Sequence, residues 1–328
     1  MRRKPFLKPL ACTVLFLALG LGGSISSLYG EEWPSKPIQI VVGYSAGGTS
    51  DLVTRGLAEP LKKILKVPVV VENKPGGASL IASGYLAKAK PDGYTLGQVA
   101  GNSITERPFF MQVPFDPVKA FSFICQVFDY GAGFVVKSDA PWKTFPEFVE
   151  AAKKQPGKLS VSMSGPGSYL QVGIAKLERK VPGLKLKVVP FKGGVDAVTA
   201  LLGGHVDSCF QSQEWRPFVE SGKLRLLAIG GRERLKDYPQ VPTWLDLGYG
   251  VFAEAPGAYA APAGLPGNIR DKLEQAFKAA MGDPKFKATM KSLSLVEVYK
   301  PGKELYEDLM KMYEENKTTI PQLGITEQ

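Results

Sequence analysis

The chain of 328 residues carries 41 lysines and arginines against 31 acidic residues, a formal net charge of +10, with three cysteines and one histidine. Its length, about twice that of a typical domain, predicts two domains with hydrophobic cores of their own. One histidine and three cysteines exclude a multi-histidine metal site and a four-cysteine zinc site, and we expect neither a metal nor a cofactor.

The first thirty residues have the order of a bacterial secretory signal. Four basic residues precede an apolar run over 10–21 and a small, polar stretch. The run is shorter than the roughly 20 residues that a membrane span requires. We therefore expect residues 1–30 to be a signal peptide that is removed after export, at a site between about Ser26 and Gly30. An uncleaved membrane anchor is the alternative.

The mature chain is less basic than the full sequence, because four basic residues leave with the signal and the net charge falls to about +6. The remaining basic residues form no stripe interleaved with aromatic residues, so we expect no nucleic-acid partner. Cys125 and Cys209 remain, both in apolar, strand-like runs. We expect them to be buried and unpaired, and a disulfide between them is the alternative.

Strands and helices alternate along the first part of the mature chain. Short runs rich in β-branched residues predict strands, and apolar residues at helical spacing predict the helices between them. In chain order the pattern gives strand 37–44, helix 51–65, strand 67–72, helix 78–89 and strand 94–100. This βαβαβ order indicates a parallel sheet with helices on both faces.

A second α/β block begins near Val127. It contains predicted strands over 133–136, 159–163, 186–190, 206–210 and 224–229, and helices over 145–154, 169–180 and 195–202. The C-terminal third adds helices over 268–281 and 303–319. The repeated alternation is typical of two α/β domains in one chain.

Two glycine-rich loops stand between a strand and a helix, a position where α/β proteins bind anions. The first is Ser45-Ala46-Gly47-Gly48-Thr49-Ser50, and the second is Ser164-Gly165-Pro166-Gly167-Ser168. Glycine lets the backbone approach a ligand closely, and the first-turn N–H groups of the following helix stabilise negative charge without a lysine or arginine. The loops therefore predict two anion sites, with tight turns that bind nothing as the alternative.

Neither loop has the spacing of a nucleotide-binding or nucleophile motif. The glycines do not form Gly-x-Gly-x-x-Gly, and no Gly-Lys-Ser/Thr follows them. Ser162 and Pro166 occupy the positions where a nucleophile elbow around Ser164 requires glycine. The loops are therefore not predicted to bind a nucleotide or to present a catalytic serine.

Ten short motifs in a fixed order connect the chain with a known family. They are Trp33–Ile38, Ile40–Gly48, Val70–Gly76, Pro91–Leu96, Pro114–Asp116, Gly165–Ser168, Phe191–Gly194, Leu201–Asp207, Gly222–Ala228 and Ala261–Pro266. Through them the mature chain resembles, over nearly its whole length, the substrate-binding proteins of tripartite tricarboxylate transporters, the Bug-type family.

The resemblance implies an α/β fold of the type II-like periplasmic-binding-protein class. Two lobes, each with a mainly parallel sheet flanked by helices, are expected to be joined by two hinge strands near 125–130 and 227–231. Lobe 1 is then expected to comprise 31–128 plus 231–328, and lobe 2 to comprise 129–230. The protein is expected to be a monomer.

The resemblance also implies that a small carboxylate binds between the two glycine loops, held mainly by backbone N–H groups. Carried over to this chain, the ligand-binding residues are Tyr44, Ser45, Ala46, Gly47, Gly48 and Thr49 from one lobe and Ser164, Gly165, Gly167 and Ser168 from the other. Asn102, at the carboxyl edge of the predicted sheet, and Asp207, which resembles a cleft position of the family, are further candidates. A turn-forming role for Asn102 and a loop-capping role for Asp207 are the alternatives.

The chain departs from the family pattern at several positions. Gly43-Tyr44 stands where Pro-Phe is usual, Glu106 where asparagine is common, Gln171 where histidine is common and Ala255 where an aromatic residue is common. These departures leave the carboxylate anchor intact but leave the ligand open. Citrate-like acids, dicarboxylates, acidic amino acids and aromatic carboxylates all remain.

The function that the resemblance implies is capture of a carboxylate in the periplasm and its delivery to the permease subunits of a tripartite tricarboxylate-type transporter, without catalysis. A receptor for a membrane sensor kinase is one alternative. A secreted hydrolase that uses Ser164 or Ser168 is the other, with His205 as the only histidine that could serve as its base.

Overall fold

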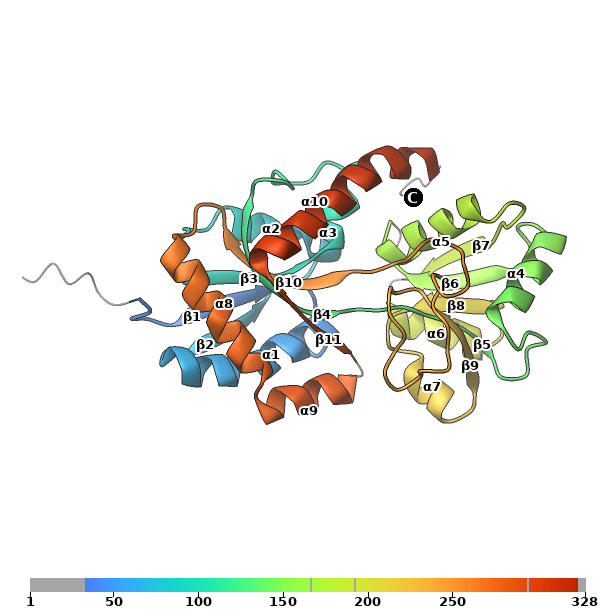
Figure 1. Ribbon diagram of the computed structural model, residues 1–328, viewed down its shortest axis with the longest axis horizontal. Helices are drawn as coiled ribbons and strands as arrows, with labels where there is room; N and C mark the ends of the chain where they lie inside the picture. Colours follow the sequence, from blue (N-terminus) through green and yellow to red (C-terminus); the bar gives the residue numbers. More distant parts are fainter. Residues whose placement is uncertain (1–32, 166, 192, 294, 324–328) are drawn as a thin grey trace, which may run out of the picture.

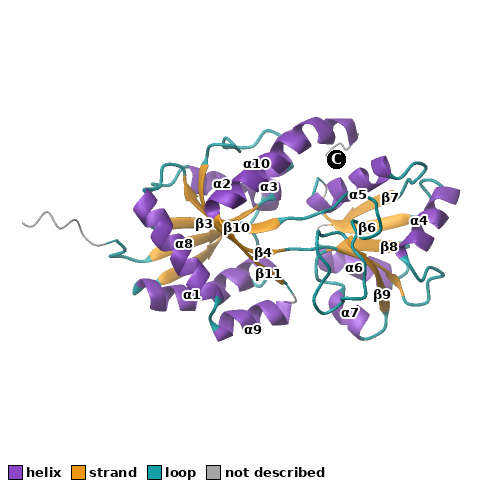
Figure 2. Cartoon of the chain, in the orientation of Figure 1, coloured by secondary structure: helices purple, strands orange, loops and turns teal. Residues whose placement is uncertain are grey.

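The computed structural model describes residues 33–165, 167–191, 193–293 and 295–323, and the signal peptide expected at 1–30 lies outside them. The chain forms two lobes side by side, each built on one sheet (Figure 1). Figure 2 shows the strands of each lobe between helices, with extended segments that run from one lobe to the other. No helix in the described part of the chain has the length and apolar composition to cross a membrane.

The sheet of the first lobe has six strands in the order β11-β4-β10-β3-β1-β2. The strands are β1 (Ile38–Val42), β2 (Val69–Asn73), β3 (Thr95–Ala100), β4 (Phe121–Asp129), β10 (Pro256–Pro262) and β11 (Val296–Pro301). The helices of this lobe are α1 (Thr49–Leu65), α2 (Leu80–Ala87), α3 (Asn102–Thr105), α8 (Gly267–Met281), α9 (Pro284–Leu293) and α10 (Gly302–Thr319). Three 3₁₀ turns accompany them: η1 (Gly77–Ser79), η2 (Arg107–Phe109) and η3 (Ile320–Leu323). β1 pairs in parallel with β2 and β3, which confirms the parallel βαβαβ unit predicted from the sequence.

The sheet of the second lobe has five strands in the order β7-β6-β8-β5-β9. The strands are β5 (Gly133–Lys137), β6 (Ser160–Ser164), β7 (Lys187–Phe191), β8 (Ser208–Gln211) and β9 (Leu224–Ile229). The helices are α4 (Phe145–Lys154), α5 (Tyr169–Lys180), α6 (Gly194–Leu202) and α7 (Arg216–Glu220). β6 is parallel to both of its neighbours, so its carboxyl end lies beside that of β7.

Both sheets are mixed, which corrects the prediction that they are mainly parallel. β10 is antiparallel to β3 and β4, and β11 is antiparallel to β4. In the second lobe β5 is antiparallel to β8 and β9. The path of the chain explains the first lobe: β4 carries the chain out towards the second lobe and β10 brings it back, so the two neighbours run in opposite directions.

The chain crosses between the lobes at residues 130–132 and again near 253–255. The sequence prediction assigns residues 231–255 to the first lobe, and for this segment it is wrong. Trp244 and Ala253 are buried in the hydrophobic core of the second lobe, so the segment after β9 packs there before the chain returns.

The C-terminal helix makes a third link between the lobes. Lys176 Nζ on α5 donates a hydrogen bond to Asn316 Oδ1 on α10 at 2.8 Å. Asn316 Nδ2 donates to the Thr105 carbonyl at 2.8 Å and to a carboxylate oxygen of Glu106 at 3.3 Å. Burial raises the pKa of Glu106 and lowers the pKa of Lys176, because each is poorly hydrated. This buried polar chain ties the first lobe to α5.

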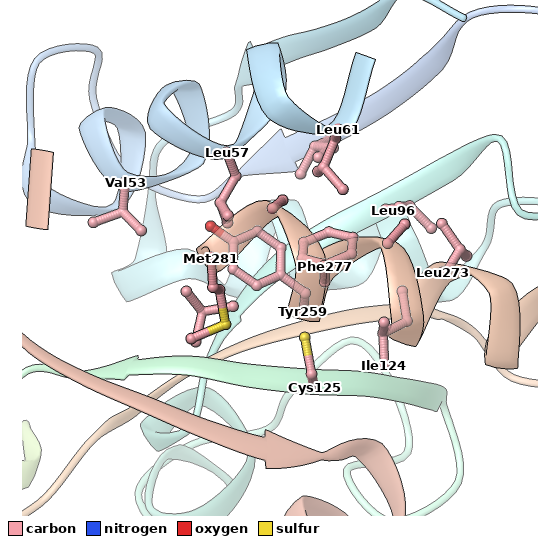
Figure 3. Close-up of a cluster of buried hydrophobic side chains, with 14 of the residues drawn as sticks. Val53, Leu57, Leu61, Leu96, Ile124, Cys125, Tyr259, Leu273, Phe277 and Met281 are labelled. Carbon is pink, nitrogen blue, oxygen red and sulfur yellow. The ribbon is translucent and has the colours of Figure 1, made fainter. Parts of the chain in front are cut away.

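The first-lobe core fixes the position of α1. Val53, Leu57 and Leu61 recur every four residues along α1 and are at most 1% exposed. They pack in one cluster with Tyr259 of β10 and Phe277 of α8 (Figure 3). Each fully buried side chain of this kind contributes roughly 1.5–3 kcal/mol. The N-terminus of α1 is thereby held rigidly at the side of the lobe where β1 ends.

Candidate ligand-binding site

A cavity of about 570 Å³ lies between the lobes, a volume that suits a small organic ligand. Most of the residues expected from the sequence line it: Tyr44, Ser45, Gly48, Thr49, Asn102, Ser164, Gly165 and Ser168. The expected residues that do not line it are Ala46, Gly47, Gly167 and Asp207. The structure therefore brings the two glycine loops to one cavity, although only part of each loop reaches it.

The first loop turns into α1 around Asp51, which is 2% exposed. The Gly47 N–H donates to Asp51 Oδ2 at 2.8 Å, and Arg55 Nε and Asn73 Nδ2 donate to Oδ1 at 2.9 Å. Burial alone raises the pKa of Asp51, but these hydrogen bonds outweigh it and lower the pKa below its ordinary value. The Gly47 amide is thus bonded within the loop. The first turn of α1, at Thr49, supplies the N–H groups that have no acceptor inside the helix.

The second loop also satisfies part of its own backbone. The Gly167 N–H donates to Gln171 Oε1 at 2.7 Å, and Ser168 Oγ caps α5 by accepting the Gln171 N–H. The Ser164 N–H donates to Gln211 Oε1 at 2.9 Å. Glycine amides that the sequence analysis expected to hold an anion are therefore used within the loop, and the first turn of α5 supplies the unbonded donors instead.

A third helix begins at the cavity, at a place that is not among the sites predicted from the sequence. Gly193 and Gly194, which start α6, both line the cavity. The sequence pattern that could have identified this helix start is a glycine pair between a predicted strand and a predicted helix. The two predicted loops have the same pattern. The N-termini of α1, α5 and α6 therefore meet at one cavity, and their dipoles favour negative charge there.

Two charged side chains that were not predicted from the sequence also line the cavity, Arg107 and Glu214. Arg107 lies in η2 of the first lobe and is 6% exposed. A Cβ placed on Gly167 would lie 3.3 Å from Arg107 Nη1, so the guanidinium lies against the loop of the opposite lobe. Glu214 lies between β8 and α7 of the second lobe. No sequence motif marks either residue, because each stands in an irregular segment that only the fold positions.

Tyrosine side chains give the cavity a neutral, polar wall. The hydroxyls of Tyr130, on the first crossing, and Ser50 are hydrogen-bonded to each other, and the Tyr169 hydroxyl donates to the Gly131 carbonyl at 3.1 Å. Burial raises the pKa of Tyr44 to about 12 and raises the pKa values of Tyr130 and Tyr169 well above their usual range. These hydroxyls therefore stay protonated at any physiological pH and can donate hydrogen bonds.

Asp207 lies at the opposite end of β6 from the cavity, which corrects its selection as a ligand residue. Its Oδ2 accepts hydrogen bonds from the Ser160 N–H at 2.8 Å and the Ser160 hydroxyl at 2.6 Å, so it caps the start of β6.

His205, in the turn after α6, is not among the lining residues, so the hydrolase alternative has no histidine base in the cavity. Within the described residues, no group of three or more His, Cys, Asp or Glu side chains could hold a metal ion. Cys125 and Cys209 are buried and unpaired, as expected.

Comparison with known proteins gives relatives along the whole chain. Residues 53–324 match a family model described as a tripartite tricarboxylate transporter family receptor. A UPF0065 protein of Cupriavidus necator is 35% identical over 325 residues, which covers 99% of this chain and 99% of the relative.

Solved structures have the same two-lobed fold. A TctC solute binding protein from Polaromonas, solved without ligand, is 27% identical with a TM-score of 0.77 and covers 88% of this chain and 99% of its own. The periplasmic binding protein BugD is 28% identical with a TM-score of 0.75 and covers 90% of this chain and 100% of its own. The type II-like two-lobed architecture expected from the sequence is thereby confirmed.

Proposed function

The chain belongs to the receptor family of tripartite tricarboxylate transporters, and the receptors of this family are periplasmic solute-binding proteins. From this premise we propose that the protein captures a small organic carboxylate between its lobes. We propose further that it delivers the carboxylate to the permease subunits of such a transporter. The protein works in this proposal as a monomer in the periplasm, after loss of its signal peptide. It binds and releases its ligand and catalyses no reaction.

The observation that carries the proposal is the meeting of the N-termini of α1 and α5 and one guanidinium at a single cavity between the lobes. Unbonded first-turn N–H groups and the positive ends of helix dipoles stabilise a carboxylate, and Arg107 adds a full positive charge beside them. The N-terminus of α1 belongs to the first lobe and that of α5 belongs to the second. A carboxylate held by both sides binds the closed form more tightly than an open one, so it shifts the population towards closure.

The first test is a thermal-denaturation screen of the mature protein against a panel of small organic acids, followed by calorimetry with the acids that raise the melting temperature. Binding to the native state raises the apparent stability by mass action. Arg107→Gln is expected to weaken binding of the best acid at least about tenfold, because it removes a charge-assisted contact. Arg179→Gln is the matched control, since Arg179 is exposed in the last turn of α5. A panel without any stabilising carboxylate would contradict the proposal.

Delivery to a permease requires a test in cells. Deletion of the gene is expected to abolish uptake of the acid identified by calorimetry, and expression of the wild-type chain is expected to restore it. Unchanged uptake with a lost transcriptional response to the same acid would instead identify the protein as the receptor of a sensor kinase.

A further inference from the structure

The described residues that line the cavity between the lobes include one positive and one negative side chain. Arg107 comes from the first lobe and Glu214 from the second, and these are the charged side chains among the described lining residues. A receptor for an unsubstituted or doubly charged acid has no need of a carboxylate in its cavity, because that group repels the ligand. The presence of Glu214 therefore requires an explanation beyond carboxylate capture.

Glu214 is held in place by neighbouring groups. Gln211 Nε2 donates to Glu214 Oε2 at 3.1 Å, while Gln211 Oε1 accepts the Ser164 N–H at 2.9 Å. Gln211 is 2% exposed and cannot turn away without breaking both bonds. One rigid amide thus connects the second glycine loop to the Glu214 carboxylate.

The Glu214 carboxylate also occupies the N-terminus of α6. A Cβ placed on Gly194, the first residue of that helix, would lie 2.5 Å from Glu214 Cδ and Oε1. Only glycine permits this approach, and the helix dipole favours the negative charge at this position. The positive end of α6 is therefore already compensated by the protein's own carboxylate, while the first-turn N–H groups of α1 and α5 also lie at the cavity.

No ion pair joins Glu214 to a lysine or arginine within the described residues. A carboxylate that lines a ligand cavity and is only partly exposed to solvent is stabilised most by a cationic hydrogen-bond donor. We propose that Glu214 is the residue that determines specificity, and that the ligand is a carboxylate that also bears an amine. The ligand carboxylate binds at α1, α5 and Arg107, and its ammonium group donates to Glu214. This inference rests on the proposed function, since it presumes that a carboxylate is bound.

The test compares matched sets of acids by calorimetry with the mature protein. The four acids of each set have the same number of carbon atoms: the unsubstituted acid, the 2-amino acid, the acid with a terminal amine and the dicarboxylic acid. Butyrate, 2-aminobutyrate, 4-aminobutyrate and succinate form the first set. The five-carbon and six-carbon homologues form the second and third sets. An amine-bearing member is expected to bind at least about tenfold more tightly than the unsubstituted acid and the dicarboxylic acid of its set. This comparison needs no variant and remains decisive if a substitution prevents folding.

Glu214→Gln tests the residue itself. The substitution keeps the shape and removes the charge, so it is expected to abolish the preference for the amine-bearing acid and to tighten binding of the dicarboxylic acid. Glu220→Gln is the matched control, because Glu220 is an exposed glutamate at the end of α7 in the same lobe, and it is expected to keep the wild-type preference.

The outcomes separate the two proposals. If unsubstituted or dicarboxylic acids bind as tightly as their amine-bearing counterparts, or if Glu214→Gln keeps the preference, the specificity inference is overturned while carboxylate capture stands. If no acid of any set or of the wider panel binds, the proposed function itself is overturned.

Discussion

We expect Asp129 to make the stability of the protein depend on pH in a direction opposite to that of most carboxylates. It ends β4 at the first crossing, and its Oδ1 accepts the Gly131 N–H at 3.0 Å. Burial and the nearby Glu254 carboxylate raise its pKa to about 7. Glu254 lies at the other crossing and is itself paired with Arg232, whose Nε lies 3.0 Å from Glu254 Oε2. The two segments that join the lobes thus each carry a carboxylate.

The direction of the effect follows from proton binding. Between about pH 4 and pH 7 the unfolded chain has lost the Asp129 proton while the native protein keeps it, so the free energy of unfolding falls as the pH rises through this window. A rise from 3.8 to about 7 corresponds to at most about 4 kcal/mol. Asp129 keeps some solvent exposure, and screening by water reduces the effect, so we expect about 2 kcal/mol.

Asp129→Asn is the perturbation that isolates this effect. The asparagine oxygen can still accept the Gly131 N–H, but it carries no charge at any pH. Urea unfolding at about pH 5 and pH 8 measures the free energy of unfolding of both proteins. The variant is expected to lose about 1 kcal/mol less than the wild type between these two pH values, because part of the effect lies below pH 5.

The control is Asp139→Asn, an exposed aspartate after β5, which is expected to behave like the wild type. If Asp129→Asn shows the same loss of stability with rising pH as the wild type, Asp129 does not keep its proton in the native protein, and the reasoning from burial and Glu254 is wrong.

Three further substitutions test packing and the link between the lobes. Gly194→Ala places a methyl group 2.5 Å from the Glu214 carboxylate. Calorimetry is expected to show that it weakens ligand binding at least about tenfold. Unchanged affinity would contradict the close approach of the Glu214 carboxylate to Gly194. Asn316→Ala removes the hydrogen-bond acceptor of Lys176 and a buried donor. Urea unfolding is expected to show that the free energy of unfolding falls by about 1–3 kcal/mol. A fall of less than about 0.5 kcal/mol would show that the link between α5 and α10 does not stabilise the protein. Phe277→Ala empties a fully buried position in the first-lobe core and is expected to cost about 3–5 kcal/mol in the same measurement.

Much of the fold could be predicted because local pattern and tertiary environment agree. The predicted helices over 145–154 and 169–180 have the observed bounds of α4 and α5, where apolar spacing and a hydroxyl cap coincide. β10 was missed because its sequence, PGAYAAP, has no β-branched residue. It becomes a strand because β3 and β4 pair with it on both sides. β11 was missed because Glu297 and Lys300 interrupt its short apolar run and it lies, only partly buried, at the edge of the sheet.

The candidate site could be predicted to the level of loops but not of atoms. Strand–glycine–helix order identified two of the three helix starts at the cavity. It could not show that Asp51 and Gln171 bond to the amides of Gly47 and Gly167, because each bond depends on a side-chain conformation four residues further along the chain. Arg107 and Glu214 could not be distinguished from surface charges, since only the packing of the two lobes brings them to one cavity.

The strand order of the first lobe also determines when that lobe can be completed during synthesis. β4 lies between β10 and β11, which are both encoded after the whole second lobe. The second lobe, by contrast, is one continuous stretch of chain between the two crossings and can form its core as soon as that stretch is available. Until β10 arrives, β3 presents an unpaired edge that other chains could join. The lobe whose first strands are made first is therefore completed last, and until then its β3 edge is open to pairing with another chain.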